Sequence, residues 1–189
     1  MPDRPPLAVL IGGAPGSGKT TLADKLGPAL DLPVLHADGL FHGRWRTLGR
    51  GMELGAWHVE PFYGSMELWA EAGISFISEQ TWRPGISEPD VITRLAPLCT
   101  LVHVHCRSRN SPERWEQRMR DDPLCGTTRL SKLTPTIRQL SEDLMEPLDF
   151  GCPAIVVDTD DGYQPALASI VTEIDAAYSR PIFHELDPP

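Results

Sequence analysis

The stretch Gly13 to Thr20, which reads GAPGSGKT, decides the fold of this 189-residue chain. It fits the phosphate-binding pattern of a glycine, four variable residues and then Gly-Lys-Ser/Thr at every fixed position. Residues 7–11 are apolar and have the length of a buried strand, and residues 20–30 repeat apolar side chains at helical spacing. A chance match in a glycine-rich turn is the alternative, but the order of strand, loop and helix favours a phosphate site.

Such a loop binds phosphate mainly through its backbone. Glycines let the N–H groups point inward at phosphate oxygens, and the start of the following helix adds partial positive charge. We expect Lys19 to reach the β- and γ-phosphates of a nucleotide and the Thr20 hydroxyl to bind Mg²⁺. The nucleotide-binding residues predicted from the loop are Gly13, Ala14, Pro15, Gly16, Ser17, Gly18, Lys19, Thr20 and Thr21.

Length and composition predict one domain over residues 1–189. The formal net charge of −9 argues against a non-specific nucleic-acid surface. The start of the chain lacks the apolar core of a secretory signal, and no apolar run is long enough to cross a bilayer. Four dispersed cysteines without metal-site spacing are typical of reduced thiols, so we expect a cytoplasmic protein that binds neither nucleic acid nor membrane.

Five apolar segments alternate with helical patterns along the chain. This alternation predicts an α/β fold of three layers, in which a five-stranded parallel sheet is flanked by helices. The strands are expected at residues 7–11, 32–37, 74–77, 100–105 and 154–157, and the helices at 20–30, 61–72, 87–98, 111–120, from 134 onward and 163–178. Gly27-Pro28 leaves open an earlier end of the first helix at Leu26.

Two acidic residues follow predicted strands, where ligands gather in open parallel sheets. Asp38 after the second strand is a candidate catalytic carboxylate, or a group that orders Mg²⁺ through water, and its alternative is a turn residue before Gly39. Glu79 after the third strand is a candidate for arranging metal, water or substrate, and its alternative is a surface turn residue. Arg83 is a candidate substrate or phosphate contact.

Residues 39–60 form a segment rich in glycine, arginine, tryptophan and histidine, with weak periodicity. Aromatic and cationic side chains on a long glycine-bearing segment suit a substrate pocket that closes over its ligand. Alternatively, the tryptophans are core anchors and the arginines are solvated. The candidate substrate-binding residues here are His42, Arg44, Trp45, Arg46 and Trp57.

A basic helix is predicted to begin at Ser111-Pro112-Glu113. Arg114 and Arg118 share one of its faces by i,i+4 spacing, and such a pair can clamp polyphosphate and neutralise charge during transfer. The alternative is a solvated basic helix whose arginines pair with Glu113 and Glu116. Residues 107–146 as a whole are a candidate lid. His103 and His105 alternate onto one face of the fourth strand, and we interpret them as structural.

The chain resembles the small P-loop kinases of the nucleoside-monophosphate-kinase-like group, which includes gluconate kinase, shikimate kinase and chloramphenicol phosphotransferase. The phosphate loop is the specific match, and the supporting matches are residues 35–38, 114–120 and 157–159. The resemblance implies a catalytic or substrate-orienting role for Asp38 and a lid that closes on the phosphates. It also places Asp158 and Thr159 near the adenine. The acidic group after the third strand departs from a clean Walker B pattern.

We therefore expect an ATP-dependent transfer of the γ-phosphoryl group to a hydroxyl of a small molecule, a metabolite or an antibiotic, with Mg²⁺ as cofactor. ATP is favoured as donor because the guanine-binding signature Asn-Lys-x-Asp is absent from the sequence. The alternatives are a nucleotide-dependent switch or regulatory protein and a nucleoside or nucleotide kinase. The protein is expected to be a monomer or a homodimer.

Overall fold

The computed structural model describes residues 4–39, 59–121 and 127–179. Within these ranges five strands form one sheet in the order β2-β3-β1-β4-β5, and every neighbouring pair is parallel. The predicted α/β fold with a five-stranded parallel sheet is therefore confirmed. The strands are β1 (Leu7–Gly13), β2 (Val34–His36), β3 (Phe76–Glu79), β4 (Thr100–Arg107) and β5 (Ala154–Asp158).

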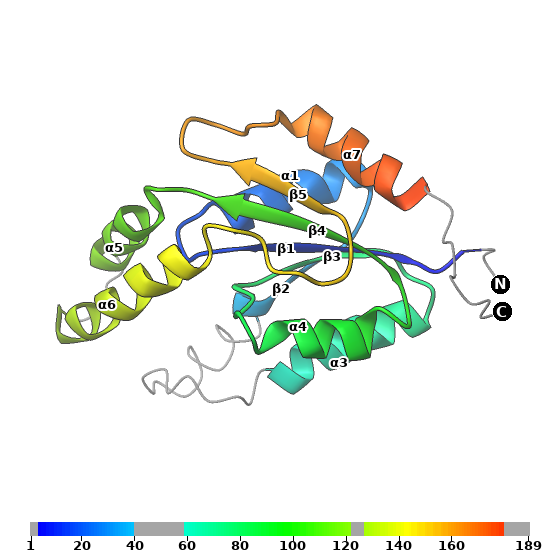
Figure 1. The fold of residues 1–189 in the computed structure, drawn as a ribbon, viewed down its shortest axis with the longest axis horizontal. Helices are drawn as coiled ribbons and strands as arrows, with labels where there is room; N and C mark the ends of the chain where they lie inside the picture. The colour runs from blue at the N-terminus through cyan, green and yellow to red at the C-terminus, as the bar shows by residue number, and fades with distance from the viewer. Residues whose placement is uncertain (1–3, 40–58, 122–126, 180–189) are drawn as a thin grey trace, which may run out of the picture.

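Helices cover both faces of the sheet (Figure 1). One face carries α1 (Lys19–Leu30) and α7 (Leu167–Ser179), and the other carries α3 (Val59–Glu71), α4 (Ser87–Asp90) and the π-helix η2 (Val91–Leu95). Helices α5 (Ser111–Asp121) and α6 (Thr127–Asp143) pack on each other beyond the carboxyl ends of the strands. In the described part of the chain, no helix combines the length and the apolar character needed to span a membrane.

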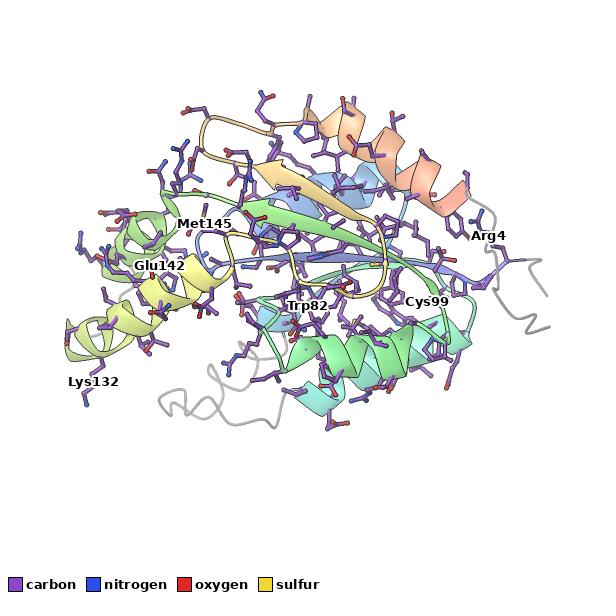
Figure 2. The ribbon with its side chains drawn as sticks, viewed as in Figure 1. Arg4, Trp82, Cys99, Lys132, Glu142 and Met145 are labelled. Carbon is purple, nitrogen blue, oxygen red and sulfur yellow. The ribbon has the colours of Figure 1, made fainter. Side chains whose placement is uncertain are left out.

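The core consists of two apolar clusters on opposite faces of the sheet. Strand β1 lies at the centre, and all seven of its residues are buried, as expected for a strand covered on both faces. Leu22 and Leu26 of α1 pack on one face. Phe62 of α3 and Trp82 pack on the other, and Figure 2 shows Trp82 between the sheet and α4. The burial of β1 on both sides fixes the position of the loop that follows it.

Strand β3 lies two residues later than the sequence predicted. It runs from Phe76 to Glu79, because Ala8 to Ile11 of β1 pair with these four residues, and Ile74 is left exposed before it. The shift matters for Glu79, which becomes the last residue of a central strand and is 4% exposed. The alternative that Glu79 is a surface turn residue is therefore wrong.

Two prolines lie inside helices. The first helix, predicted over residues 20–30, is confirmed, and the earlier end at Leu26 that was left open is excluded. Helix α1 continues through Pro28 to Leu30 and is capped by Asp31, whose N–H donates to the Gly27 carbonyl. The left-handed backbone of Asp31 (φ 53°) lets the N–H of Leu32 donate to the same carbonyl at 3.0 Å. Helix α6 likewise includes Pro135, so the helix start predicted at residue 134 is wrong. Each proline lacks one backbone donor, but packing of the helix outweighs that local loss. Helix α7 begins at Leu167, four residues after the predicted start at 163.

Leu26 tests how α1 is held on the sheet. Its side chain is fully buried, so Leu26→Ala should lower the free energy of unfolding by about 2–5 kcal/mol through lost burial and a residual cavity. The measurement is urea unfolding followed by circular dichroism. Leu68→Ala on α3 is the matched control, because Leu68 is 64% exposed and should change stability by less than about 0.5 kcal/mol. Equal losses for the two variants would contradict the assigned packing of α1.

Candidate functional site

The loop between β1 and α1 has the backbone that its glycines predict. Gly13, Gly16 and Gly18 have φ values of 132°, 87° and 87°, a region that side-chain-bearing residues rarely adopt. A Cβ on Gly13 would collide with the Cys106 carbonyl, and one on Gly16 would collide with the Ser111 carbonyl. The loop therefore packs directly against the end of β4 at Gly13 and against the first turn of α5 at Gly16. Only glycine fits at these two positions.

Lys19 is the first residue of α1 and one of the few buried charges in the described chain. Its side chain is 8% exposed, and its Nζ atom donates to the Ala14 carbonyl at 3.2 Å. Glu79 Oε1 lies 3.7 Å from Nζ, which is an ion-pair distance but too long for a hydrogen bond. Burying an ammonium group costs its hydration, and the hydrogen bond to Ala14 and the nearby carboxylate of Glu79 offset that loss. The arrangement keeps a cation inside the curve of the loop, close to the amides that begin α1.

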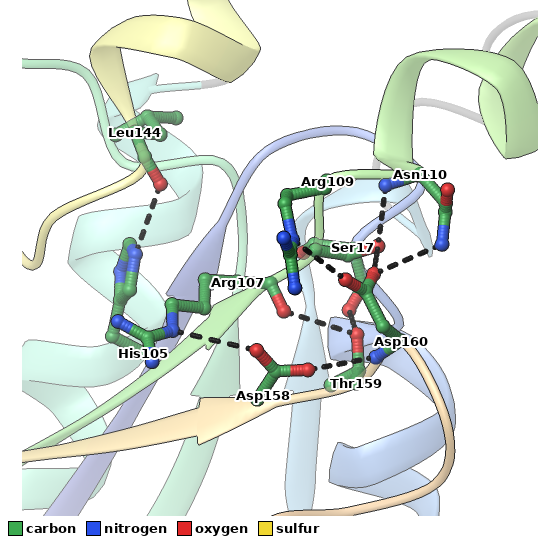
Figure 3. Close-up of polar contacts among 10 residues, drawn as sticks. Ser17, His105, Arg107, Arg109, Asn110, Leu144, Asp158, Thr159 and Asp160 are labelled. Carbon is green, nitrogen blue, oxygen red and sulfur yellow. Dashed lines mark hydrogen bonds and ion pairs between the residues drawn. The ribbon is translucent and has the colours of Figure 1, made fainter.

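Thr159 fastens this loop to the end of β5 (Figure 3). Its Oγ1 atom donates to the Ser17 carbonyl at 2.8 Å, and its backbone N–H donates to the Arg107 carbonyl at 3.1 Å. The Thr159 side chain therefore lies under the loop backbone and links the β5 end, the β4 end and the loop. Among the described residues, the fully buried Ser17 hydroxyl oxygen has no hydrogen-bond partner.

The residues after β5 are held by the β4–α5 connection. Asp160 accepts hydrogen bonds from Ser108 Oγ at 2.6 Å and from Asn110 Nδ2 at 3.2 Å, and Arg109 Nε lies 3.4 Å away (Figure 3). The hydrogen bond from Ser108 is the main reason why the pKa of the Asp160 carboxyl lies below its usual range, with Asn110 and Arg109 adding to it. Asp158, also predicted near the nucleotide, forms an ion pair with Arg107 at 3.7 Å.

The predicted arginine pair on α5 is divided between two environments. Arg114 donates to the Thr159 carbonyl at 3.0 Å and to the Asp160 carbonyl at 2.8 Å, so it fixes the loop after β5. Arg118 lies one turn further along α5 and is exposed. Arg138 of α6 contacts Glu113 and Glu116 at 3.3 and 2.6 Å, and Glu116 also pairs with Arg120 of α5 itself at 3.3 Å. The contacts of Arg138 join α5 to α6.

A histidine missed by the sequence analysis lies next to Glu79. His36 is the last residue of β2, and its Nδ1 atom lies 3.1 Å from Glu79 Oε2. Its Nε2 atom lies 3.2 Å from Asp24 Oδ1 on α1. The position of His36 at a strand end, two residues before Asp38, is the signal that could have identified it. Asp38 itself is exposed, in a helical turn over residues 37–39.

The two histidines of β4 point into the core. His105 Nε2 lies 3.0 Å from the Leu144 carbonyl just after α6 (Figure 3), and burial lowers the pKa of its ring. His103 packs on Phe150, with ring centroids 4.7 Å apart. Burial, with His105 nearby, lowers the pKa of His103 to about 3. Both positions agree with the structural interpretation of the pair.

The remaining candidates divide into exposed residues and residues outside the description. Thr20, Thr21 and Arg83 have exposed side chains at the carboxyl edge of the sheet. Five substrate candidates lie outside the described residues, and they are His42, Arg44, Trp45, Arg46 and Trp57. In the described ranges, no group of three or more His, Cys, Asp or Glu side chains is arranged to hold a metal ion. Magnesium bound with a nucleotide uses only one or two protein ligands together with phosphate oxygens.

Comparisons with solved structures agree on the fold. A proposed kinase from Chloroflexus aurantiacus superimposes with a TM-score of 0.74 at 22% identity, over 92% of this chain and 99% of that one. A sugar kinase from Janibacter gives 0.61 at 22% identity, over 92% and 96% of the chains. A gluconokinase from Sinorhizobium meliloti gives 0.55 at 20% identity, over 94% of each chain. The resemblance to P-loop small-molecule kinases is thereby confirmed for the fold.

Comparisons of the sequence with family models and curated proteins find no relative. No protein-family model matches the chain, and no curated protein matches it. Identities of 20–22% to solved structures establish a shared architecture, whereas function depends on the site that each chain builds on it.

Asp160 provides a pH-dependent test of the contacts beneath the loop. Asp160→Asn should lower the free energy of unfolding by about 1 kcal/mol at pH 7, because charge-assisted hydrogen bonds are weakened. The folded-state pKa of Asp160 lies below its unfolded value, so this stabilisation is present above an unfolded pKa of about 3.9 and is lost as the pH falls through the lower folded value.

The measurement is urea unfolding of both proteins at pH 7, at pH 5 and at about pH 3.5. The difference between wild type and variant should stay constant from pH 7 to 5 and narrow below about pH 4. Asp161→Asn is the matched control, because Asp161 is the neighbouring acid and is exposed. A difference that remained the same at all three pH values would show that the charge of Asp160 does not stabilise the fold.

Proposed function

We propose that this protein is an ATP-dependent kinase that transfers the γ-phosphoryl group to a hydroxyl of a small molecule. One observation carries the proposal: a buried lysine lies inside a loop of left-handed glycines, at the carboxyl end of the central strand and at the start of a helix. Backbone amides, a helix N-terminus and an ammonium group together favour a bound polyphosphate. A residue with a Cβ at Gly13 or Gly16 would fill the space on which this loop depends.

Different residues of the loop would bind different parts of ATP, the phosphoryl donor. The amides of Gly16, Ser17 and Gly18 would hold the phosphates. Lys19 and the Ser17 amide both donate to the Ala14 carbonyl, and each would exchange that contact for one with a phosphate oxygen. Thr20 would be a ligand of Mg²⁺, which supplies charge neutralisation at the phosphates when it is bound. Glu79 would remain beside Lys19 as the acid of the central sheet. Asp158 and Thr159 would contribute to the nucleotide site from the end of β5, because Thr159 donates to the Ser17 carbonyl of the loop.

The acceptor side would be built from the carboxyl ends of β2 and β3. We propose that Asp38 orients the acceptor hydroxyl or takes its proton, and that it can contribute to metal binding through water. Arg83 and the segment over residues 39–60 would bind the acceptor, and residues 107–146 would cover the phosphates. Both arginines of the α5 pair are exposed, but Arg114 is bound to the carbonyls of Thr159 and Asp160. Arg118 would therefore be the one that screens charge on the transferred group.

The fold comparisons support a small-molecule acceptor, because proteins of this architecture are described as a sugar kinase and a gluconokinase. A screen of phosphoryl acceptors with Mg·ATP, covering sugars, hydroxylated antibiotics and nucleosides, distinguishes the proposal from its alternatives. A phosphorylated sugar or antibiotic would support it. A phosphorylated nucleoside would favour a nucleoside kinase, and slow hydrolysis that no acceptor accelerates would favour a nucleotide-dependent switch.

The free thiols of Cys99, Cys106 and Cys152 agree with a reducing, cytoplasmic setting.

Lys19→Met tests the donor site. It should abolish phosphoryl transfer and weaken Mg·ATP binding at least tenfold, since the loop loses the cation that reaches the phosphates. It should also destabilise the fold by a few kcal/mol, because Glu79 would keep a buried charge without its cation. Calorimetric titration with Mg·ATP and urea unfolding measure the two effects.

Lys25→Met on the exposed side of α1 is the matched control for loss of a lysine and should bind Mg·ATP normally. Thr20→Val repeats the test at an exposed side chain whose removal leaves the core intact. Wild-type affinity in both Lys19→Met and Thr20→Val would refute nucleotide binding by this loop.

Asp38→Asn tests the acceptor site once an acceptor has been found. It should leave Mg·ATP affinity unchanged and lower turnover by about 10²–10⁴-fold, as loss of a general base does. The measurement pairs calorimetry with steady-state transfer to that acceptor. Asp31→Asn makes the same chemical change at an exposed residue after α1 and should turn over at the wild-type rate. Unchanged turnover in Asp38→Asn would remove Asp38 from the mechanism.

A further inference from the structure

Four charged or polar side chains form a continuous line from the surface of α1 to the phosphate loop. Asp24 on α1 contacts His36 on β2, His36 contacts Glu79 on β3, and Glu79 faces Lys19 at the start of α1. The exposed fractions of Asp24, His36 and Glu79 fall from 63% to 28% and then to 5% along the line. The outer part can therefore be changed without opening the core.

His36 is held in place by the sheet as well as by its side-chain contacts. The parallel register pairs His36 with Glu79, so the two side chains leave neighbouring strands at the same level. Carboxylate oxygens can only accept hydrogen bonds, so the hydrogen bond to Glu79 requires the ring hydrogen on Nδ1. The ring thus spans the gap between Glu79 on one side and Asp24 on the other, at 3.1 and 3.2 Å.

The distances suggest what this contact does for the loop. Glu79 Oε2 is engaged by His36, whereas Oε1 stays 3.7 Å from the ammonium group of Lys19, beyond hydrogen-bonding distance. Opposite charges in a poorly solvated site attract strongly, so a carboxylate held only by Lys19 would close on it. A direct hydrogen bond would compete with phosphate for the same ammonium group.

We infer that His36 is a positioning residue, which holds the Glu79 carboxylate back from Lys19 so that the ammonium group remains exchangeable toward a phosphate. This inference rests on the proposed function, because it assigns His36 a part in nucleotide binding by the loop. It concerns neither the acceptor nor the transfer step. Its effect should therefore be visible with Mg·ATP alone.

The test is calorimetric titration of Mg·ATP into purified full-length variants. His36→Leu removes the donor to Glu79 and should weaken Mg·ATP binding about tenfold, which corresponds to about 1.4 kcal/mol. His36→Asn is the matched variant, because its side-chain amide can still donate toward Glu79 while contact with Asp24 is lost. Binding to His36→Asn should stay within about threefold of wild type, a difference of less than 1 kcal/mol.

A double-mutant cycle separates positioning of Glu79 from a general effect on the fold. In a Glu79→Gln background the same His36→Leu change should alter binding less than twofold, because no carboxylate is left to restrain. A tenfold loss in both backgrounds, or no loss in either, would overturn the inference. If His36→Leu unfolds, as judged by thermal unfolding without nucleotide, His36→Ala at this partly exposed strand end replaces it in the cycle.

Failure of the inference and failure of the proposed function give different results. If the wild-type protein, folded by circular dichroism, shows no heat of binding with Mg·ATP, both the proposed function and the role of His36 are refuted. If the wild type binds and the cycle shows no coupling between His36 and Glu79, only the role of His36 is refuted.

Discussion

The buried ammonium group of Lys19 is the feature on which the site depends. Lysine is rarely buried in proteins, because an ammonium group loses much of its hydration when it leaves water. Here the cost is offset by the Ala14 carbonyl and by Glu79, which lies across from it on β3. The pairing of Ile11 with Glu79 in the sheet sets this position. The register of two central strands therefore determines whether the loop can hold its cation.

Close backbone packing gives the loop its shape. Trp82 lies against Gly12 and donates its Nε1 hydrogen to the Ile11 carbonyl at 3.1 Å, while Gly13 and Gly16 leave no room for a side chain. Contacts from three elements thus reach the backbone of one short segment. The glycines permit the conformation, but the neighbouring elements select it. A backbone restrained in this way is what preorganised binding requires, and the proposed function relies on it.

The sequence predicted what depends on neighbouring residues along the chain. Strand β1, the loop and α1 follow from apolar spacing and glycine positions, and the start of α5 follows from Ser111 and Pro112. The sequence did not predict features that depend on contacts between segments far apart in the chain. The burial of Glu79 depends on its pairing with β1, and no local pattern indicates it.

Two further features depend on contacts between elements. His36 gains its importance from Asp24 and Glu79, which come from two other elements and could not be brought together by spacing alone. Helix α6 runs through Pro135 because Arg138 and the packing on α5 stabilise it as a whole. Local signals therefore identified the loop, whereas the residues that support it became visible only in the tertiary structure.

The same contacts limit how the α5–α6 pair can move relative to the loop. The first turn of α5 lies directly against Gly16, and Arg114 binds the carbonyls of Thr159 and Asp160. Thr159 in turn binds the Ser17 carbonyl. The base of α5, the end of β5 and the phosphate loop are thus joined by hydrogen bonds and close packing into one unit. Arg118 shares the face of Arg114 one turn beyond that unit and is exposed. Under the proposed function it is therefore the arginine of the pair that would contact a phosphate, whereas Arg114 has a part in holding the unit together.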